Sequence, residues 1–199
     1  MKLLCVCLIL IFSACVLQAD GAKTAVLIDN SKSTCGFYQT GMMRQLAEAV
    51  IGAAEAPQVF LFNDKVIPLP NGIESADFQC STKYTFIDGA FDTVRHSNQP
   101  DIIWLITDNV QDEGGPTKGN TEAFYRKLQT DEVRRIYVFP CFLQFDGELT
   151  DAPGQPWHTG ERGVLVYAIL LNANQQNAFE KEITNFEQRA KPFNAKRLL

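Results

Sequence analysis

The chain has 199 residues, a formal net charge of −5, 46% hydrophobic residues and 21% charged residues. This composition is ordinary for one globular domain and excludes an intrinsically disordered chain, which would have less apolar material and a larger charge imbalance. A nucleic-acid-binding protein would carry clustered excess Lys and Arg, whereas this chain has a mild acidic excess. Six cysteines are too few for a disulfide scaffold, and three of them lie in the first fifteen residues.

Residues 1–19 have the order of a secretory signal peptide: Lys2, an apolar run over residues 3–12, and small residues ending at Ala19. The run is too short for a transmembrane helix, which needs about 20 apolar residues. We therefore expect cleavage near Ala19, export to the periplasm or the extracellular space, and one mature domain over residues 20–199. Ser13-Ala14-Cys15 also resembles a bacterial lipobox, so a lipid anchor at Cys15 is an alternative to a cysteine that only fills the signal segment.

The three cysteines beyond the signal segment are Cys35, Cys80 and Cys141, an odd number that permits at most one internal disulfide. Cys141 lies inside the apolar run 136–143, where a buried free thiol is expected. Cys35 and Cys80 have loop-like surroundings, so they are the predicted pair.

The first half of the mature chain alternates apolar runs with helical spacing. Residues 24–29 form a continuous apolar run that ends in a carboxylate, which is typical of a central parallel strand covered on both faces. Apolar residues then recur at helical spacing at Met43, Leu46, Ala47, Val50 and Ile51. Residues 58–62 and 65–69 flank Asn63-Asp64, which predicts a tight hairpin.

The second half continues the alternation. Helices are expected from residue 87 to 94 and from 121 to 134, with strands at 101–107, 135–143 and 163–171. The apolar face of a last helix is given by Phe179, Ile183, Phe186 and Ala190. This order predicts an α/β fold, with a doubly wound, mostly parallel sheet, helices on both faces and a short antiparallel edge hairpin.

The connection at residues 146–162 cannot be a crossover helix, because Pro153, Gly154, Pro156 and Gly160 interrupt it. The last strand therefore either runs antiparallel at the edge of the sheet or follows a long loop.

Polar side chains follow two of the expected strands directly. Residues 24–29 lead into Asp29-Asn30-Ser31-Lys32-Ser33, and residues 101–107 lead into Asp108. Ligands of open parallel sheets bind at the carboxyl ends of the strands, so we expect two acids and two hydroxyls to meet at one edge. Such an oxygen-rich group suits a hard divalent cation.

These residues resemble the metal-ion-dependent adhesion site of von Willebrand factor A domains. The pattern consists of Asp29-x-Ser31-x-Ser33, a later Thr85 followed by apolar residues at Ile87, Ala90 and Phe91, and Asp108 at a strand end. Asn109 stands where the family commonly has Gly, and Asn is the usual substitute for Gly at positive φ. The resemblance covers residues 24–143 and fades after that.

The resemblance implies a site for Mg²⁺, or for Mn²⁺ or Ca²⁺. Hydroxyls of Ser31, Ser33 and Thr85 would bind the ion, and Asp29 and Asp108 would act directly or through water. It also implies a secreted, non-enzymatic binding module that captures a protein partner through an Asp or Glu carboxylate. We expect no nucleic-acid partner and no transmembrane segment.

Other polar residues have a functional and a plain interpretation. Lys32, Trp157 and His158 are candidate partner contacts, although Lys32 could simply face solvent and Trp157 could fold back onto apolar surface. Asp112 and Glu113 could hold a second ion or form an exposed acidic loop. Asp88 and His96 are expected only to complement the dipole of their helix, at its first and last turns.

Two further functions are alternatives: a metal-dependent hydrolase or phosphatase on a doubly wound fold, and a structural subunit of an envelope complex. Phosphatases of the haloacid dehalogenase type also place Asp at the end of the first strand, but they need a second Asp two residues later as general acid, and this chain has Ser31 there. A structural subunit of an envelope complex with a vestigial metal site is the third interpretation.

Overall fold

The computed structural model describes residues 21–76, 78, 80, 82, 85–109, 120–149 and 157–198. The strands are β1 (Thr24–Asp29), β2 (Gln58–Phe62), β3 (Val66–Pro68), β4 (Ile102–Thr107), β5 (Arg135–Gly147) and β6 (His158–Leu170). The α-helices are α1 (Cys35–Gln39), α2 (Met42–Ile51), α3 (Ile87–Asn98), α4 (Asn120–Leu128) and α5 (Gln176–Arg189). Short 3₁₀ turns are η1 (Lys32–Thr34), η2 (Ile73–Ser75), η3 (Ala173–Gln175) and η4 (Lys191–Phe193). The predicted signal peptide and Cys15 lie outside the described residues.

The strands form one mixed six-stranded sheet in the order β3-β2-β1-β4-β6-β5. β1 pairs in parallel with both β2 and β4, whereas β3 is antiparallel to β2, and β6 is antiparallel to both β4 and β5. The α/β class, the central parallel strands and the hairpin around Asn63-Asp64 are therefore confirmed.

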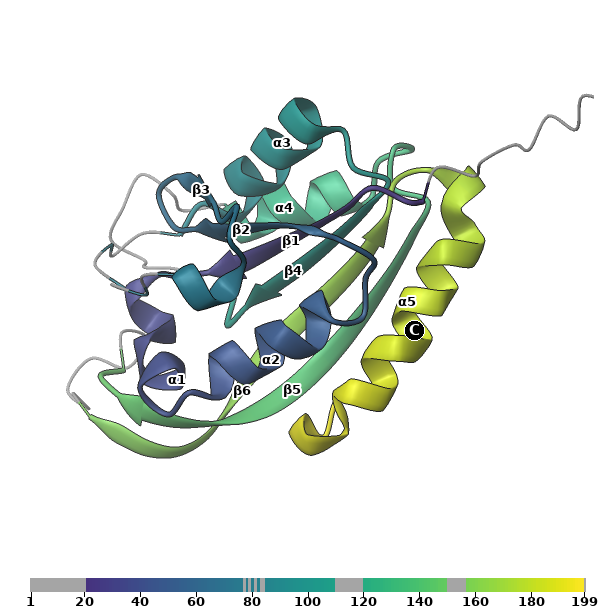
Figure 1. Cartoon of the computed structure of the whole chain (residues 1–199). Helices are drawn as coiled ribbons and strands as arrows, with labels where there is room; N and C mark the ends of the chain where they lie inside the picture. Colours follow the sequence, from purple (N-terminus) through teal and green to yellow (C-terminus); the bar gives the residue numbers. More distant parts are fainter. Residues whose placement is uncertain are drawn as a thin grey trace, which may run out of the picture.

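Helices pack against both faces of this sheet, as Figure 1 shows: α3 and α4 lie on one side and α1, α2 and α5 on the other. All six residues of β1 are buried because alternate side chains serve different cores. Val26 and Ile28 belong to the core with α2 and α5. Ala25 and Leu27 belong to the core with α3 and α4. This explains why β1 is apolar without alternation.

The last two strands correct the prediction. β6 does run antiparallel, but β5 takes the edge of the sheet and β6 lies between it and β4. Both strands have 13 residues, so β5 continues past the predicted end at residue 143 and β6 begins five residues before the predicted start at residue 163. A hairpin needs no crossover helix, which explains how a connection rich in Pro and Gly can be accommodated. The predicted helix at 121–134 is also shorter, since α4 ends at Leu128.

The long hairpin projects beyond the carboxyl end of β4. β4 stops pairing at Thr107, opposite Leu165, whereas β5 and β6 remain paired as far as Gly147 and His158. α1 packs on this extension, and a Cβ atom on Gly36 would lie 2.5 Å from the ring of Phe145, so only glycine permits the contact. In Figure 1 the extension curves beneath α1.

No helix among the described residues is both long enough and apolar enough to cross a membrane.

Candidate metal centre

The loop after β1 begins with a buried carboxylate. Asp29 is fully buried at the carboxyl end of β1. Its Oδ1 accepts a hydrogen bond from the backbone N–H of Ser31 at 2.9 Å, and its Oδ2 accepts one from Oγ1 of Thr107, the last residue of β4, at 2.7 Å. Because β1 and β4 are parallel neighbours, their carboxyl ends meet and bring these groups together.

A chain of hydroxyl groups connects this loop to Asp108. Oγ of Ser31 and Oγ of Ser33 lie 3.0 Å apart, and Ser33 donates to Oδ1 of Asp108 at 3.1 Å. Ser31 and Ser33 are buried, whereas Asp108 is partly exposed. The structure thus brings Asp29, Ser31, Ser33 and Asp108 together as predicted, and Oδ2 of Asp108 is itself buried.

The environment of Asp29 disfavours its charged form. Burial raises the pKa of this carboxyl from 3.8 to about 6, against the opposing effect of hydrogen bonds from Thr107 and Ser31. The nearby cation Lys32 forms its ion pair with Glu148, at 2.9 Å, and not with Asp29. A bound divalent cation would supply the positive charge that favours a deprotonated Asp29.

The fifth predicted ligand, Thr85, lies on a different segment of the chain from the other four. It is buried just before α3, and the N–H of the next residue, Phe86, donates to the carbonyl of Asn63 at 3.0 Å. Within the described parts of the chain, no hydrogen bond joins Thr85 to Asp29, Ser31, Ser33 or Asp108. The same segment does reach the loop at Thr82, which forms a parallel bridge with Ser31 and accepts the N–H of Lys32 at 2.9 Å.

The donor set fits a hard cation. Two buried oxygen atoms beside the loop, Oδ1 of Asn30 and Oγ1 of Thr82, have no hydrogen-bond partner among the described residues. Buried polar atoms of this kind ordinarily have a partner, such as a water or an ion. The described chain contains no cluster of three or more His, Cys, Asp and Glu side chains. This centre has a different composition, because hydroxyl groups outnumber its two carboxylates.

Several supporting residues were not predicted. The phenol of Tyr38 donates to the carbonyl of Asp29, and Thr34 donates to the carbonyl of Ser31 at 2.9 Å. Burial and the Asp29 carboxylate raise the pKa of the Tyr38 phenol. Thr107 could have been found from its position at a strand end beside Asp108. Nothing in the sequence pattern singles out Tyr38.

Asn109 has the conformation expected of a substitute for glycine. Its φ is 56°, in the left-handed region. Its N–H donates to Oγ1 of Thr107 at 3.0 Å, and its side-chain amide donates to the phenol of Tyr125 at 3.0 Å. The phenol of Tyr125 lies 3.2 Å from that of Tyr167. The turn after β4 is therefore fixed from two sides.

The projecting hairpin carries the candidate partner contacts. Glu148, just after β5, pairs with Lys32, so the end of the hairpin lies beside residues 29–33, which we call the candidate metal loop. Trp157 is 60% exposed and donates from Nε1 to Oδ1 of Asp146 at 2.8 Å, so it is not folded onto the core. This bond and one from Thr159 lower the pKa of Asp146. His158 begins β6, and its ring centroid is 6.2 Å from that of Phe145.

The remaining predicted polar residues lie either in the end turns of α3 or outside the described residues. Asp88 is in the first turn of α3 and His96 in the last, as expected for dipole partners. Asp88 also lies 3.7 Å from Nζ of Lys127. Asp112 and Glu113 fall outside the described residues.

Cys35, Cys80 and Cys141 are free thiols, so the predicted disulfide between Cys35 and Cys80 is not formed in this structure. Cys141 is fully buried in β5, as predicted, and burial raises its pKa to about 12. Cys35 and Cys80 lie against each other beside the candidate metal loop. Sγ of Cys35 is 3.8 Å from the carbonyl oxygen of Cys80, and its interaction with the Cys80 side chain lowers the pKa of Cys35.

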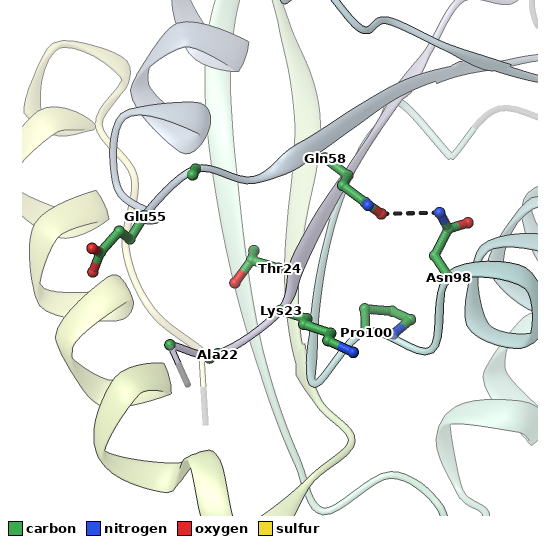
Figure 2. Close-up of a pocket in the computed structure, with 9 residues that line it drawn as sticks. Ala22, Lys23, Thr24, Glu55, Gln58, Asn98 and Pro100 are labelled. Atoms are coloured by element: carbon green, nitrogen blue, oxygen red, sulfur yellow. Dashed lines mark hydrogen bonds between the residues drawn. The ribbon is translucent and has the colours of Figure 1, made fainter. Parts of the chain in front are cut away.

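The described residues at the opposite end of the sheet form a pocket and a second buried carboxylate network. A pocket of about 350 Å³ lies there, beside the amino ends of β1 and β2, and Figure 2 shows Asn98 donating to Gln58 across it, at 2.9 Å. Nearby, Glu182 of α5 is buried and accepts hydrogen bonds from Oγ1 of Thr24 at 2.7 Å and from Nε1 of Trp104 at 2.8 Å. This network was not predicted either.

Comparisons with protein-family models, with curated proteins and with solved structures found no match for this chain.

Proposed function

We propose that this chain is an exported binding module that holds a divalent cation at the carboxyl ends of β1 and β4 and captures a protein partner through an acidic side chain. The observation that carries the proposal is the connected group Asp29–Ser31–Ser33–Asp108, with a fully buried carboxylate at one end and a partly exposed one at the other.

The position of the group in the sheet supports a binding role. After β1 the chain adds β2 and β3 on one side, and it later places β4 on the other side of β1. The carboxyl ends of β1 and β4 therefore flank the point where the strand order reverses, which is where ligands bind in doubly wound sheets. The proposed relationship to von Willebrand factor A domains rests on the motif residues of this half of the sheet, whereas the hairpin of β5 and β6 lies outside the resemblance.

Each residue has a defined role in the proposal. The buried Asp29 fixes the loop through the N–H of Ser31, and Thr107 holds its second oxygen. Ser31 and Ser33 provide neutral oxygen donors, and Asp108 provides the second negative charge. Mg²⁺, Mn²⁺ or Ca²⁺ would be the hard cation at this site. Because only two carboxylates and several neutral oxygens would surround the ion, part of its positive charge would remain to attract a further carboxylate. Thr85 is proposed as a hydroxyl ligand from the segment that passes at Thr82.

The hairpin gives the partner a second surface. Lys32 and Trp157 lie at the same end of the molecule as the candidate metal loop, and the Trp157 indole is exposed yet held by Asp146. An aromatic side chain that is already ordered loses little conformational freedom on binding, which favours it as a contact. His158, the first residue of β6, is a further candidate contact for the partner.

The test uses Mn²⁺ as the probe and the relaxation rate of water protons as the measurement. Mn²⁺ bound to the protein should increase this rate, and a soluble dicarboxylate such as glutarate should reduce the increase by replacing bound water. Asp29→Ala and Ser31→Ala should abolish the binding, whereas Ser97→Ala, on the distant end of α3, should keep it. Absence of Mn²⁺ binding at millimolar concentration would contradict the proposal.

The same preparation tests catalysis. Robust hydrolysis of an aryl phosphate that depends on the metal and is lost in Asp29→Ala would replace the binding function by that of a phosphatase.

A further inference from the structure

Two segments run side by side next to the candidate metal centre. Residues 31–38 follow the first strand, and residues 78, 80 and 82 precede α3. They touch at three successive places. Tyr38 stacks on Phe78 with ring centroids 4.1 Å apart, Cys35 contacts Cys80, and Thr82 accepts the N–H of Lys32.

The middle contact joins the Cys35 thiol to the backbone of Cys80. Sγ of Cys35 lies 3.8 Å from the carbonyl oxygen of Cys80, and the Cys80 thiol donates to the carbonyl of Phe78 at 3.7 Å. Cys80 has φ 45°, in the left-handed region that non-glycine residues rarely adopt. The side chain of Cys35 is partly exposed, whereas Cys80 is only 6% exposed.

We infer that Cys35 and Cys80 form a disulfide bond by exchange with a disulfide oxidant, and that this bond holds the segment of Thr82 and Thr85 beside the candidate metal loop. The formation of the bond rests on the contact between the two cysteines alone. Its effect on the metal rests on the proposed function.

The exchange is balanced in atoms and electrons. The thiol of Cys35, which solvent can reach, loses its proton and attacks one sulfur of the oxidant, whose other sulfur leaves as a thiolate. The Cys80 thiol then loses its proton and attacks Sγ of Cys35, and the oxidant's remaining sulfur leaves. The two cysteines lose two protons and two electrons, and the oxidant's disulfide is reduced to two thiols.

The location and the third cysteine support this assignment. The export predicted from residues 1–19 would bring the chain to a compartment where such oxidants act. Cys141 is fully buried in β5, and in the described part of the chain its thiol contacts the carbonyl of Phe139, at 3.6 Å, and not another cysteine. It therefore provides a matched control within the same chain.

The cross-link also has a thermodynamic consequence. Cys35 and Cys80 are 45 residues apart in the sequence, so a bond between them closes a long loop in the unfolded chain. Closing such a loop stabilises the folded state, and reduction should lower the thermal midpoint by about 5–10 °C.

The first experiment tests the bond. The protein is equilibrated with oxidised glutathione, digested without reduction and analysed by mass spectrometry. The expected result is a linked pair of peptides containing Cys35 and Cys80, while the Cys141 peptide is alkylated after unfolding. Cys141→Ser should leave the linked pair unchanged. Alkylation of both Cys35 and Cys80, or a linkage that includes Cys141, would overturn the inference.

The second experiment tests the effect on the site. Mn²⁺ binding is measured for the oxidised protein, for the reduced protein and for Cys35→Ser and Cys80→Ser. We expect affinity to fall by at least about tenfold whenever the bond is absent, as for other groups that orient metal ligands. Equal affinity in both redox states would overturn the role in metal binding. A linked pair of peptides in a protein that binds no Mn²⁺ would support the bond and contradict only the proposed function.

Discussion

Two buried carboxylates lie at opposite ends of the same sheet and differ in what surrounds them. Asp29, at the carboxyl end of β1, accepts from Ser31 and Thr107, and the hydroxyls beside it lead on to Asp108. Glu182, near the amino end of β1, accepts from Thr24 and Trp104, and both donors belong to the packing of α5 on the sheet. Burial raises the pKa of both carboxyls.

The difference separates a carboxylate of the packed core from one that we propose to hold a metal ion. Glu182 satisfies the polar atoms of a large buried Trp and of Thr24, so its removal leaves two donors without an acceptor. Asp29 instead belongs to a group of oxygens in which Oδ1 of Asn30 and Oγ1 of Thr82 lack a partner among the described residues. Removal of Asp29 would likewise leave the donors of Ser31 and Thr107 without an acceptor. We therefore expect both carboxyls to hold buried donors, and the raised pKa of Asp29 to reduce the stability of the metal-free protein at neutral pH.

The largest expected effect is at Glu182. Replacing it in Glu182→Ala leaves Nε1 of Trp104 and Oγ1 of Thr24 buried without acceptors, at a cost of about 4 kcal/mol. Chemical denaturation should show this loss, and Glu182→Gln should show much less of it because an amide can bond to both groups. A loss below about 1 kcal/mol in Glu182→Ala would contradict the structural role.

The next effect is the pH dependence caused by Asp29. Its pKa is about 6 in the folded state and ordinarily 3.8, so the unfolded chain releases this proton first as pH rises. The free energy of unfolding of the metal-free protein should therefore fall by about 2 kcal/mol between pH 4 and pH 7 because of this group. Asp29→Asn should lack this fall, which the difference between its pH profile and that of the wild type measures. Parallel profiles would contradict the assignment.

We expect Ser33→Ala to reduce stability slightly and to weaken Mn²⁺ binding strongly. Ser33→Ala removes the hydroxyl between Ser31 and Asp108 and should cost about 1 kcal/mol. The dissociation constant for Mn²⁺ should rise by at least about tenfold. Ser97→Ala is the matched control on α3, since Ser97 bonds only within its own helix at Thr93 and Asn98. Equal Mn²⁺ affinity in the two variants would argue against a hydroxyl ligand at Ser33.

The smallest effects on stability are expected at two exposed side chains, Lys32 and Trp157. Lys32→Ala breaks an exposed ion pair with Glu148, and Trp157→Ala removes an exposed ring, so each should change the free energy of unfolding by less than about 1 kcal/mol. Chemical denaturation checks this. A larger loss in Trp157→Ala would mean that the indole has a structural role and is not a surface available to a partner.

The sequence predicted the central part of the fold well. Residues 24–29 are apolar throughout because β1 is buried on both faces, and the spacing in α2 and α3 follows a single buried stripe. The four connected site residues were predicted because three come from one loop and the fourth follows an adjacent parallel strand. Local pattern and strand direction were sufficient for these features.

Other features depend on contacts between distant residues that a local pattern does not contain. The order of β5 and β6 was missed because the hairpin's length is decided by pairing, not by apolar runs: β6 begins with His158, Thr159 and Gly160, which read as loop. Tyr38 and Glu182 were missed because their roles arise from neighbours brought together only by folding.

The most direct test of the central claim is the thermal midpoint at pH 7.5 of the wild type, Asp29→Asn and Glu182→Gln during titration with Mg²⁺. At ten times the dissociation constant, the wild type and Glu182→Gln should each rise by about 4 °C. Asp29→Asn should not rise, although it keeps the shape and size of the side chain. No rise in the wild type at millimolar Mg²⁺, or an equal rise in Asp29→Asn, would contradict a metal centre at the end of β1.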